Sequence, residues 1–131
     1  KEIILQNFDN NEGNLLYVSG EIVSSNLYKD LVSEGYSIKR IINYTVVPIT
    51  EISEKFVENI KTSMPDMVFI YSENSAKNYL NLLKKYDLLD GWMDTNLMCL
   101  GEKASAVLNE IKWKKIFIFN PGEEEFLLYK I

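Results

Sequence analysis

Short apolar runs alternate along this chain with segments whose apolar residues recur at helical spacing. The runs predict five strands, at 15–18, 38–47, 67–71, 97–100 and 116–119. Between them, apolar residues three and four positions apart predict helices, because that spacing places them on one helical face. The predicted helical stripes are Leu27, Leu31 and Val32; Ile52, Phe56 and Ile60; Ala76, Tyr79, Leu80 and Leu83; and Ala104, Val107, Leu108 and Ile111.

Small and polar residues mark where these elements begin and end. Ser24 and Ser25 are candidate N-caps for the first helix of this series, and Gly35 is its predicted stop. Pro48 ends the second strand, and a helix is predicted directly after Thr50. A short last helix is predicted after residues 120–122, with Glu123 to Glu125 in its first turn.

Strictly alternating strands and helices are typical of a parallel sheet packed between helices. The predicted fold is therefore α/β: a three-layer, five-stranded, mostly parallel, doubly wound sheet of the flavodoxin-like kind, with helices on both faces and a possible strand order of 2-1-3-4-5. The unbroken apolar run at 67–71 predicts a strand buried on both faces. Residues 1–14 are predicted to be the tail of a preceding helix and a loop, and residues 15–131 one α/β unit.

Composition narrows the possible functions. The 131 residues are 47% apolar and 25% charged, as in one globular domain or two very small ones. The net charge of −5 disfavours nucleic-acid binding, and no apolar run approaches the roughly 18 residues of a membrane span. The chain has no histidine, which excludes a Ser-His-Asp triad and a His-ligated metal, so no metal site is predicted. The single Cys99 cannot form an internal disulfide, no signal peptide is visible, and a cytoplasmic protein is expected.

Three junctions between a strand and the following helix share one design, at residues 19–21, 71–73 and 100–102. Each ends a strand with a small residue and opens a helix, and all three are expected at the carboxyl edge of the sheet, where ligands bind. The candidate binding residues at these junctions are Ser19, Gly20, Ser72, Ser75, Gly101, Lys103 and Ser105. The functional interpretation is a cleft for a ligand that bears carboxylates or phosphates. The alternative is ordinary helix capping and tight packing.

Other chemistry is less well supported. No glycine-rich nucleotide fingerprint is present, and the third strand ends in Tyr71-Ser72 where a phospho-acceptor receiver domain needs an aspartate. Cys99 lies among apolar neighbours and is predicted to be a buried, inert thiol.

Three segments have the character of motifs. They are Leu-Leu-Tyr-Val-Ser-Gly-Glu at 15–21, Asp-Met-Val-Phe-Ile-Tyr-Ser-Glu-Asn-Ser-Ala at 66–76, and Cys-Leu-Gly-Glu-Lys-Ala-Ser-Ala-Val-Leu at 99–108. These segments resemble motifs of the uroporphyrinogen-III synthase family. Their order and spacing resemble those of the family over residues 15–131. The sequence departs from the family pattern at Ser19, where an arginine is usual, at Tyr71, where a threonine is usual, and at Glu73, where a proline is usual.

The resemblance implies a cofactor-free lyase of haem biosynthesis. Such an enzyme closes hydroxymethylbilane, a linear tetrapyrrole polycarboxylate, into uroporphyrinogen III with inversion of ring D. The second motif adds Asn74 to the candidate substrate-binding residues, and Tyr79 is the candidate acid, with a core aromatic as the alternative role. The expected partner is the small-molecule substrate, with no nucleic acid and no membrane.

The resemblance also implies that the chain is the C-terminal half, or a fragment, of a two-lobed enzyme. Residues 1–47 would then be part of one lobe and residues 48–131 part of a second, as a monomer or as a dimer that exchanges elements. Such a fragment could be inactive. The alternative is that the chain is a non-catalytic α/β module, which either binds a small anion or has a regulatory role.

Overall fold

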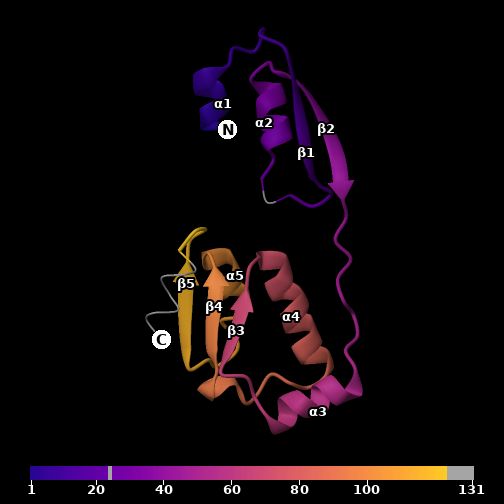
Figure 1. Cartoon of the computed structure of the whole chain (residues 1–131), viewed down its shortest axis with the longest axis vertical. Helices are drawn as coiled ribbons and strands as arrows, with labels where there is room; N and C mark the ends of the chain where they lie inside the picture. Colours follow the sequence, from indigo (N-terminus) through magenta and orange to yellow (C-terminus); the bar gives the residue numbers. More distant parts are fainter. Residues whose placement is uncertain (24, 124–131) are drawn as a thin grey trace. The chain divides into compact units, whose positions relative to one another are not determined.

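The five strands divide between two parallel sheets (Figure 1). The computed structural model describes residues 1–23 and 25–123. Strands β1 (Asn14–Gly20) and β2 (Ser37–Tyr44) pair with each other, and β3 (Met67–Ile70), β4 (Asn96–Leu100) and β5 (Lys115–Phe119) pair in that order. The prediction of one five-stranded sheet is wrong for the described residues, because strand pairing depends on hydrogen bonds between distant segments that the local pattern does not encode.

The chain forms two compact units, Lys1–Val47 and Pro48–Ile131. The second strand was predicted to continue to Val47, but β2 ends at Tyr44, and residues 45–53 form neither helix nor strand. The boundary between residues 47 and 48 is the one given by the alternative prediction, in which residues 1–47 and 48–131 belong to different lobes. That the two units belong to two lobes of a synthase stays a prediction.

The first unit contains β1, β2 and the helices α1 (Glu2–Asn7) and α2 (Leu27–Ser33). Helix α2 packs on β2 and contributes the fully buried Leu31. The helix ends as the sequence predicted: Gly35 adopts φ +86°, its N–H donates to Val32 O, and the N–H of Tyr36 donates to Leu31 O. The predicted N-caps are wrong for Ser25, because the N-cap is Asn26, and Ser24 lies outside the described residues.

One face of the β1–β2 sheet is covered and the other is open. Residues of β1 alternate between half-buried and exposed, and Leu16 on the open side is 60% exposed. This alternation is typical of a sheet packed on a helix on one side only.

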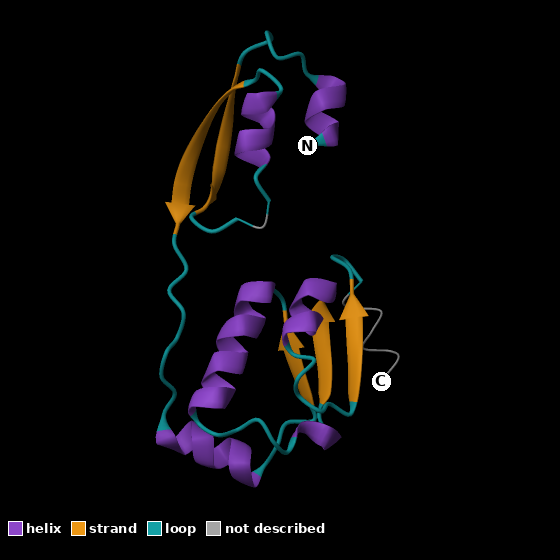
Figure 2. Ribbon diagram, turned by 180° about the vertical axis from the view of Figure 1, so that it is seen from behind, coloured by secondary structure: helices purple, strands orange, loops and turns teal. Residues whose placement is uncertain are grey.

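The second unit contains α3 (Glu54–Thr62), α4 (Glu73–Lys85), α5 (Glu102–Val107) and a short 3-10 helix, η1 (Trp92–Asp94). Helices α4 and α5 lie on one face of the β3–β4–β5 sheet (Figure 2). Helix α3 begins later than predicted, because Ser53 caps it by accepting a hydrogen bond from the N–H of Phe56. The shared core consists of Ile70, Ala76, Leu83, Leu88, Trp92, Leu97, Cys99, Ala104, Leu108 and Ile111.

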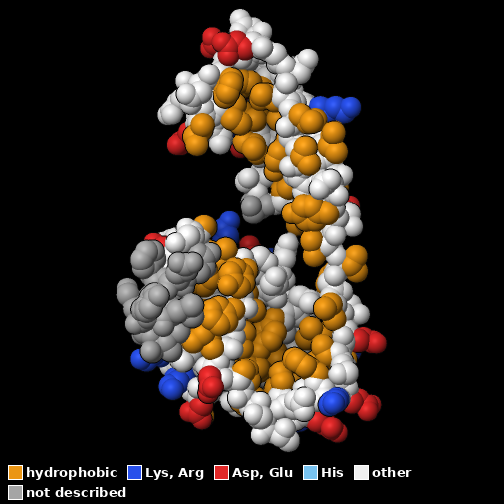
Figure 3. All heavy atoms as spheres, in the orientation of Figure 1, with side chains coloured by type: hydrophobic (Ala, Val, Ile, Leu, Met, Phe, Trp, Pro, Cys, Tyr) orange, Lys and Arg blue, Asp and Glu red, His pale blue; other side chains and the backbone are white. Residues whose placement is uncertain are grey.

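The strand at residues 67–71 was predicted to be buried on both faces. The structure shows such burial for the central strand β4 but not for β3, which contains residues 67–70. Leu97, Met98 and Cys99 of the central strand β4 are fully buried, whereas Phe69 of β3 is 43% exposed. Strand β3 pairs only with β4 among the described residues, so it lacks a neighbour on its other side. Figure 3 shows apolar side chains gathered over the second unit on the side away from α4 and α5.

One predicted helix is shorter than the pattern suggested. Helix α5 ends at Val107, and Leu108 and Ile111 enter the core from the turn that follows it. Asn120 and Glu123 form a turn in which the Asn120 N–H donates to a Glu123 carboxylate oxygen, and the rest of the predicted last helix lies outside the described residues.

No helix in residues 1–23 and 25–123 has the length and apolar character needed to cross a bilayer.

Replacing Leu108 with alanine tests whether this residue is part of the core of the second unit. Leu108 is fully buried, so Leu108→Ala is expected to lower the free energy of unfolding by about 2–5 kcal/mol. Tryptophan fluorescence in a urea titration measures this, because both tryptophans, Trp92 and Trp113, belong to the second unit. The exposed Met93→Ala is the matched control, and equal losses in the two variants would contradict a core role for Leu108.

Candidate functional site

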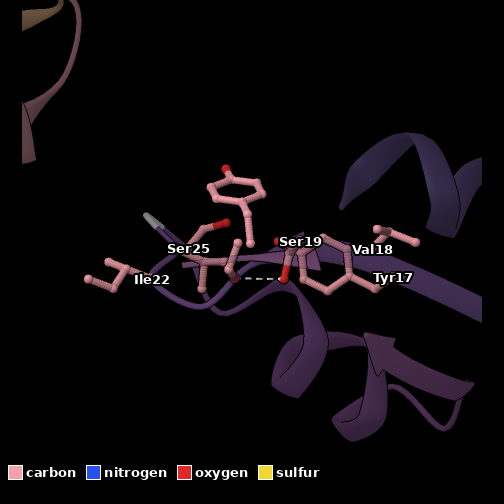
Figure 4. A pocket seen from close by; sticks show the side chains of 8 residues that line it. Tyr17, Val18, Ser19, Ile22 and Ser25 are labelled. Atoms are coloured by element: carbon pink, nitrogen blue, oxygen red, sulfur yellow. Dashed lines mark hydrogen bonds between the residues drawn. The ribbon is translucent and has the colours of Figure 1, made fainter. Parts of the chain in front are cut away.

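A pocket of about 340 Å³ lies in the first unit where β1 ends (Figure 4). Its lining residues are Tyr17, Val18, Ser19, Gly20, Ile22, Val23, Ser25 and Tyr44. The carboxyl end of a parallel strand is where ligands bind in α/β sheets. The pocket therefore includes the first predicted junction, with Ser19 and Gly20 in its wall.

Gly20 allows a close contact in this wall. A Cβ atom at Gly20 would lie 2.7 Å from ring carbons of Tyr44, closer than side-chain atoms can approach. The N–H of Glu21 donates to Tyr44 O at 2.9 Å, which holds the backbone after β1 against the end of β2. Tyr44 thus joins Gly20 in shaping the pocket.

Arg40 of β2 reaches the same junction from the neighbouring strand. Its Nε donates to Ser19 Oγ at 2.9 Å, and its Nη2 donates to Gly20 O at 2.7 Å and to Glu21 O at 2.8 Å. A guanidinium group thereby meets the side chain of Ser19, the position at which the related motif usually carries an arginine. Arg40 lies outside the motifs found in the sequence, so sequence reasoning did not identify it as part of this junction. The one available signal was that a charged residue stands in the middle of a largely apolar strand.

The junction between β3 and α4 is built largely as a helix cap. Ser72 Oγ accepts a hydrogen bond from the N–H of Ser75 at 3.0 Å and also donates to Ser75 Oγ at 2.9 Å. Both hydroxyl groups are therefore engaged in the first turn of α4, as the capping alternative predicts. Asn74 in the same turn is exposed.

The junction between β4 and α5 depends on Gly101. Gly101 adopts φ +77° and ψ 161°, and its N–H donates to Phe119 O at 3.0 Å. Ser105 is buried, and its hydroxyl donates to Glu102 O at 3.0 Å, so it is directed into its own helix. Lys103 is exposed at the start of α5.

Charges from these two junctions act on one another. Lys77 Nζ lies 2.6 Å from a carboxylate oxygen of Glu73, and this contact lowers the pKa of the Glu73 carboxyl. Lys103 lowers the same pKa by a smaller amount. Because β3 and β4 are parallel neighbours, the structure brings Ser72, Asn74, Ser75, Gly101, Lys103 and Ser105 to one edge of the second sheet. Ser19 and Gly20 belong to the first unit.

Comparison with known protein families identifies a family for this chain. The family model described as uroporphyrinogen-III synthase HemD matches residues 2–121. The chain belongs to the uroporphyrinogen-III synthase family. Members of this family are lyases of haem biosynthesis. No curated protein and no solved structure matches this chain significantly.

In this synthase-family chain, Tyr79 lies in the core of the second unit. Its ring packs edge-on against Trp92, with centroids 5.8 Å apart. Its hydroxyl is buried and has no hydrogen-bond partner within residues 1–23 and 25–123, and burial raises the Tyr79 pKa. A buried phenol that holds its proton tightly is poorly placed to protonate a substrate, so the geometry favours the core role over the acid role.

Cys99 likewise belongs to the core. Its side chain is fully buried, and burial raises the pKa of the thiol to about 11. A thiol in this state is unreactive at neutral pH, because the thiolate is the nucleophile. In the part of the chain that the structure describes, no group of three or more acidic, cysteine or histidine side chains is placed to hold a metal.

A substitution at Gly101 tests the backbone requirement of this junction. The φ and ψ of Gly101 fall in a region that side chains disfavour, although nothing lies within 4 Å of an added Cβ. Gly101→Ala is therefore expected to lower the free energy of unfolding by about 1–3 kcal/mol, as measured by urea titration. Lys103→Ala at the same junction is the control, and a Gly101→Ala variant as stable as this control would show that the backbone relaxes without strain.

Tyr79→Phe tests the core role of the tyrosine. Removal of a buried hydroxyl without a partner is expected to leave the free energy of unfolding at pH 7 unchanged or higher. Burial raises the pKa of Tyr79 in the folded state above its ordinary value near 10, which the tyrosine keeps in the unfolded state. The neutral phenol therefore contributes its full share to the free energy of unfolding below about pH 10, and this share is lost as the pH rises above that value. Urea titrations at pH 7 and pH 10.5 should therefore show a smaller alkaline loss in Tyr79→Phe than in the wild type. A clear loss of stability at pH 7 would instead indicate a partnered hydroxyl.

Proposed function

We propose that this chain supplies part of a uroporphyrinogen-III synthase that cyclises hydroxymethylbilane to uroporphyrinogen III with inversion of ring D. The observation that carries the proposal is the family match over residues 2–121, which covers most of both compact units. The pocket at the end of β1 supports it, because a family motif, at residues 15–21, forms much of the pocket wall. Residues 1–47 and 48–131 are, in this proposal, parts of the two lobes.

The pocket in the first unit suits a substrate made of pyrrole rings and carboxylates. Tyr17 and Tyr44 supply aromatic surface, against which flat rings can pack. The exposed Ser25 supplies a hydroxyl that can donate to a carboxylate. In the second unit, taken by itself, Asn74 and Lys103 are exposed and are therefore available to a ligand carboxylate.

The proposed reaction places modest demands on side-chain chemistry. The terminal hydroxyl of the bilane leaves as water after protonation, which generates an azafulvene cation. The α carbon of ring D that already carries a methylene bridge then attacks this cation and forms a spiro-pyrrolenine. The bond from that carbon to its original methylene breaks, the released methylene bonds to the free α carbon of ring D, and loss of the proton there closes the macrocycle with ring D inverted. Holding the two ends of a flexible tetrapyrrole together supplies most of the rate advantage, since orientation alone can contribute several kcal/mol.

A second function, a non-catalytic module that binds a small anion, is favoured by one observation. Tyr79, the candidate acid, has a buried hydroxyl in the core. A chain that binds a tetrapyrrole carboxylate without supplying an acid would sense or carry the ligand rather than convert it.

Product analysis distinguishes the two functions. The chain is incubated with enzymatically generated hydroxymethylbilane, and the uroporphyrin isomers are separated after oxidation. Synthase activity is expected to give isomer III, whereas uncatalysed closure gives isomer I. Gly20→Val is expected to reduce the yield of isomer III, because the larger side chain would collide with Tyr44 in the pocket wall.

Lys39→Gln, on the exposed side of β2, is the matched control and should retain the wild-type yield. Isomer I alone from the wild-type chain would contradict synthase activity of these residues and favour the binding module.

A further inference from the structure

Arg40 connects the two strands of the first sheet at the edge where the pocket lies. In the parallel register, Arg40 of β2 is paired with Tyr17 of β1, which itself lines the pocket. The half-buried Arg40 side chain extends toward the carboxyl end of β1 and donates hydrogen bonds to Ser19, Gly20 and Glu21. Its guanidinium therefore contacts every residue of the first junction motif.

The geometry of these bonds requires an arginine. Nε donates to Ser19 Oγ while Nη2, which carries two hydrogens, meets the carbonyl oxygens of two consecutive residues, Gly20 and Glu21. A planar guanidinium offers such a fixed fork of donors, whereas a lysine ammonium can occupy only one of these positions at a time. Bonds from a charged donor are also stronger than neutral ones.

The hydroxyl of Ser19 is fully used in this arrangement. Ser19 Oγ accepts from Arg40 Nε at 2.9 Å and donates to Gly20 O at 3.0 Å. Its single proton is therefore committed to the backbone, which leaves it without a donor for a ligand carboxylate. Ser19, predicted as a direct binding residue, acts here as a link between Arg40 and the turn.

The turn is also held from the end of β2. The N–H of Glu21 donates to Tyr44 O, and the register of the two strands shifts between Ser19 and Gly20. At such an irregularity some of the regular backbone hydrogen bonds between the two strands are missing. Hydrogen bonds from side chains therefore contribute more to the conformation of the turn. Arg40 and Tyr44 together fix the backbone that leads from β1 into the pocket wall.

We propose that Arg40 is a positioning residue, which acts through Ser19 and the carbonyl groups of Gly20 and Glu21 to hold the turn after β1 in the conformation that binds a carboxylate of the tetrapyrrole. This inference rests on the proposed function, because it concerns the same pocket. Arg40 does not line the pocket, so its effect on binding is indirect.

The test compares Arg40→Gln, Arg40→Lys, Ser19→Ala and the double variant Ser19→Ala/Arg40→Gln, with Lys39→Gln as the control on the same strand. Hydrogen exchange of the amides at residues 20–23 measures the order of the turn, and equilibrium dialysis with uroporphyrin III, an octacarboxylate, measures affinity. Circular dichroism establishes that each variant is folded.

Arg40→Gln is expected to speed exchange at residues 20–23 and to weaken uroporphyrin binding, each by about tenfold or more, because hydrogen bonds from a charged group are lost. Arg40→Lys should restore only a small part of either effect. The double variant should bind no more weakly than Arg40→Gln, because Ser19 acts through the same contact. Lys39→Gln should match the wild type in both measurements.

Two results would overturn the inference while leaving the proposed function in place. Wild-type exchange at residues 20–23 in Arg40→Gln would show that the turn does not depend on the guanidinium. Faster exchange with unchanged affinity would show that the ordered turn does not position the ligand. If the wild-type chain itself binds no uroporphyrin, the proposed function fails for this pocket and the positioning role fails with it.

Discussion

Parallel strand pairing is the constraint on which both units depend. Two parallel strands cannot be joined by a tight turn, so the chain must return through a crossover, here α2 in the first unit and α4 or α5 in the second. Each return leaves a junction at the carboxyl end of a strand. The pocket at the end of β1, the cap of α4 and Gly101 with its positive φ all lie at such junctions.

These junctions look alike in the sequence but have different structural roles. At the end of β3, Ser72 and Ser75 bond to each other and begin a helix. At the end of β4, the backbone freedom of Gly101 makes the turn. The end of β1 borders a pocket, and there the guanidinium of Arg40 and the ring of Tyr44 hold the wall. Similar motifs thus provide stability at two places and a binding surface at the third.

Two of the potentially reactive side chains of this chain lie in its core. Its tyrosine candidate for acid catalysis is buried against Trp92, and its only thiol is buried in β4. What the described surface offers is shape, aromatic rings, backbone carbonyls fixed by a charged side chain, and a few exposed polar groups. Such a surface is suited to holding and orienting a ligand, and less well suited to supplying a strong acid or nucleophile.

The sequence by itself determined the elements, because strands and helices follow from local apolar spacing: all five strands lie within a few residues of their predicted positions, and Gly35 ends α2 as expected. The motifs at residues 15–21, 66–76 and 99–108 also indicated the family. Only the tertiary structure decided that β1 and β2 form a sheet of their own, and that the hydroxyl of Tyr79 is buried beside Trp92. It also brought Arg40 to Ser19 across 21 positions of the chain. Such pairings depend on contacts between distant segments, and a local pattern of apolar and polar residues carries no information about which distant group a side chain will meet.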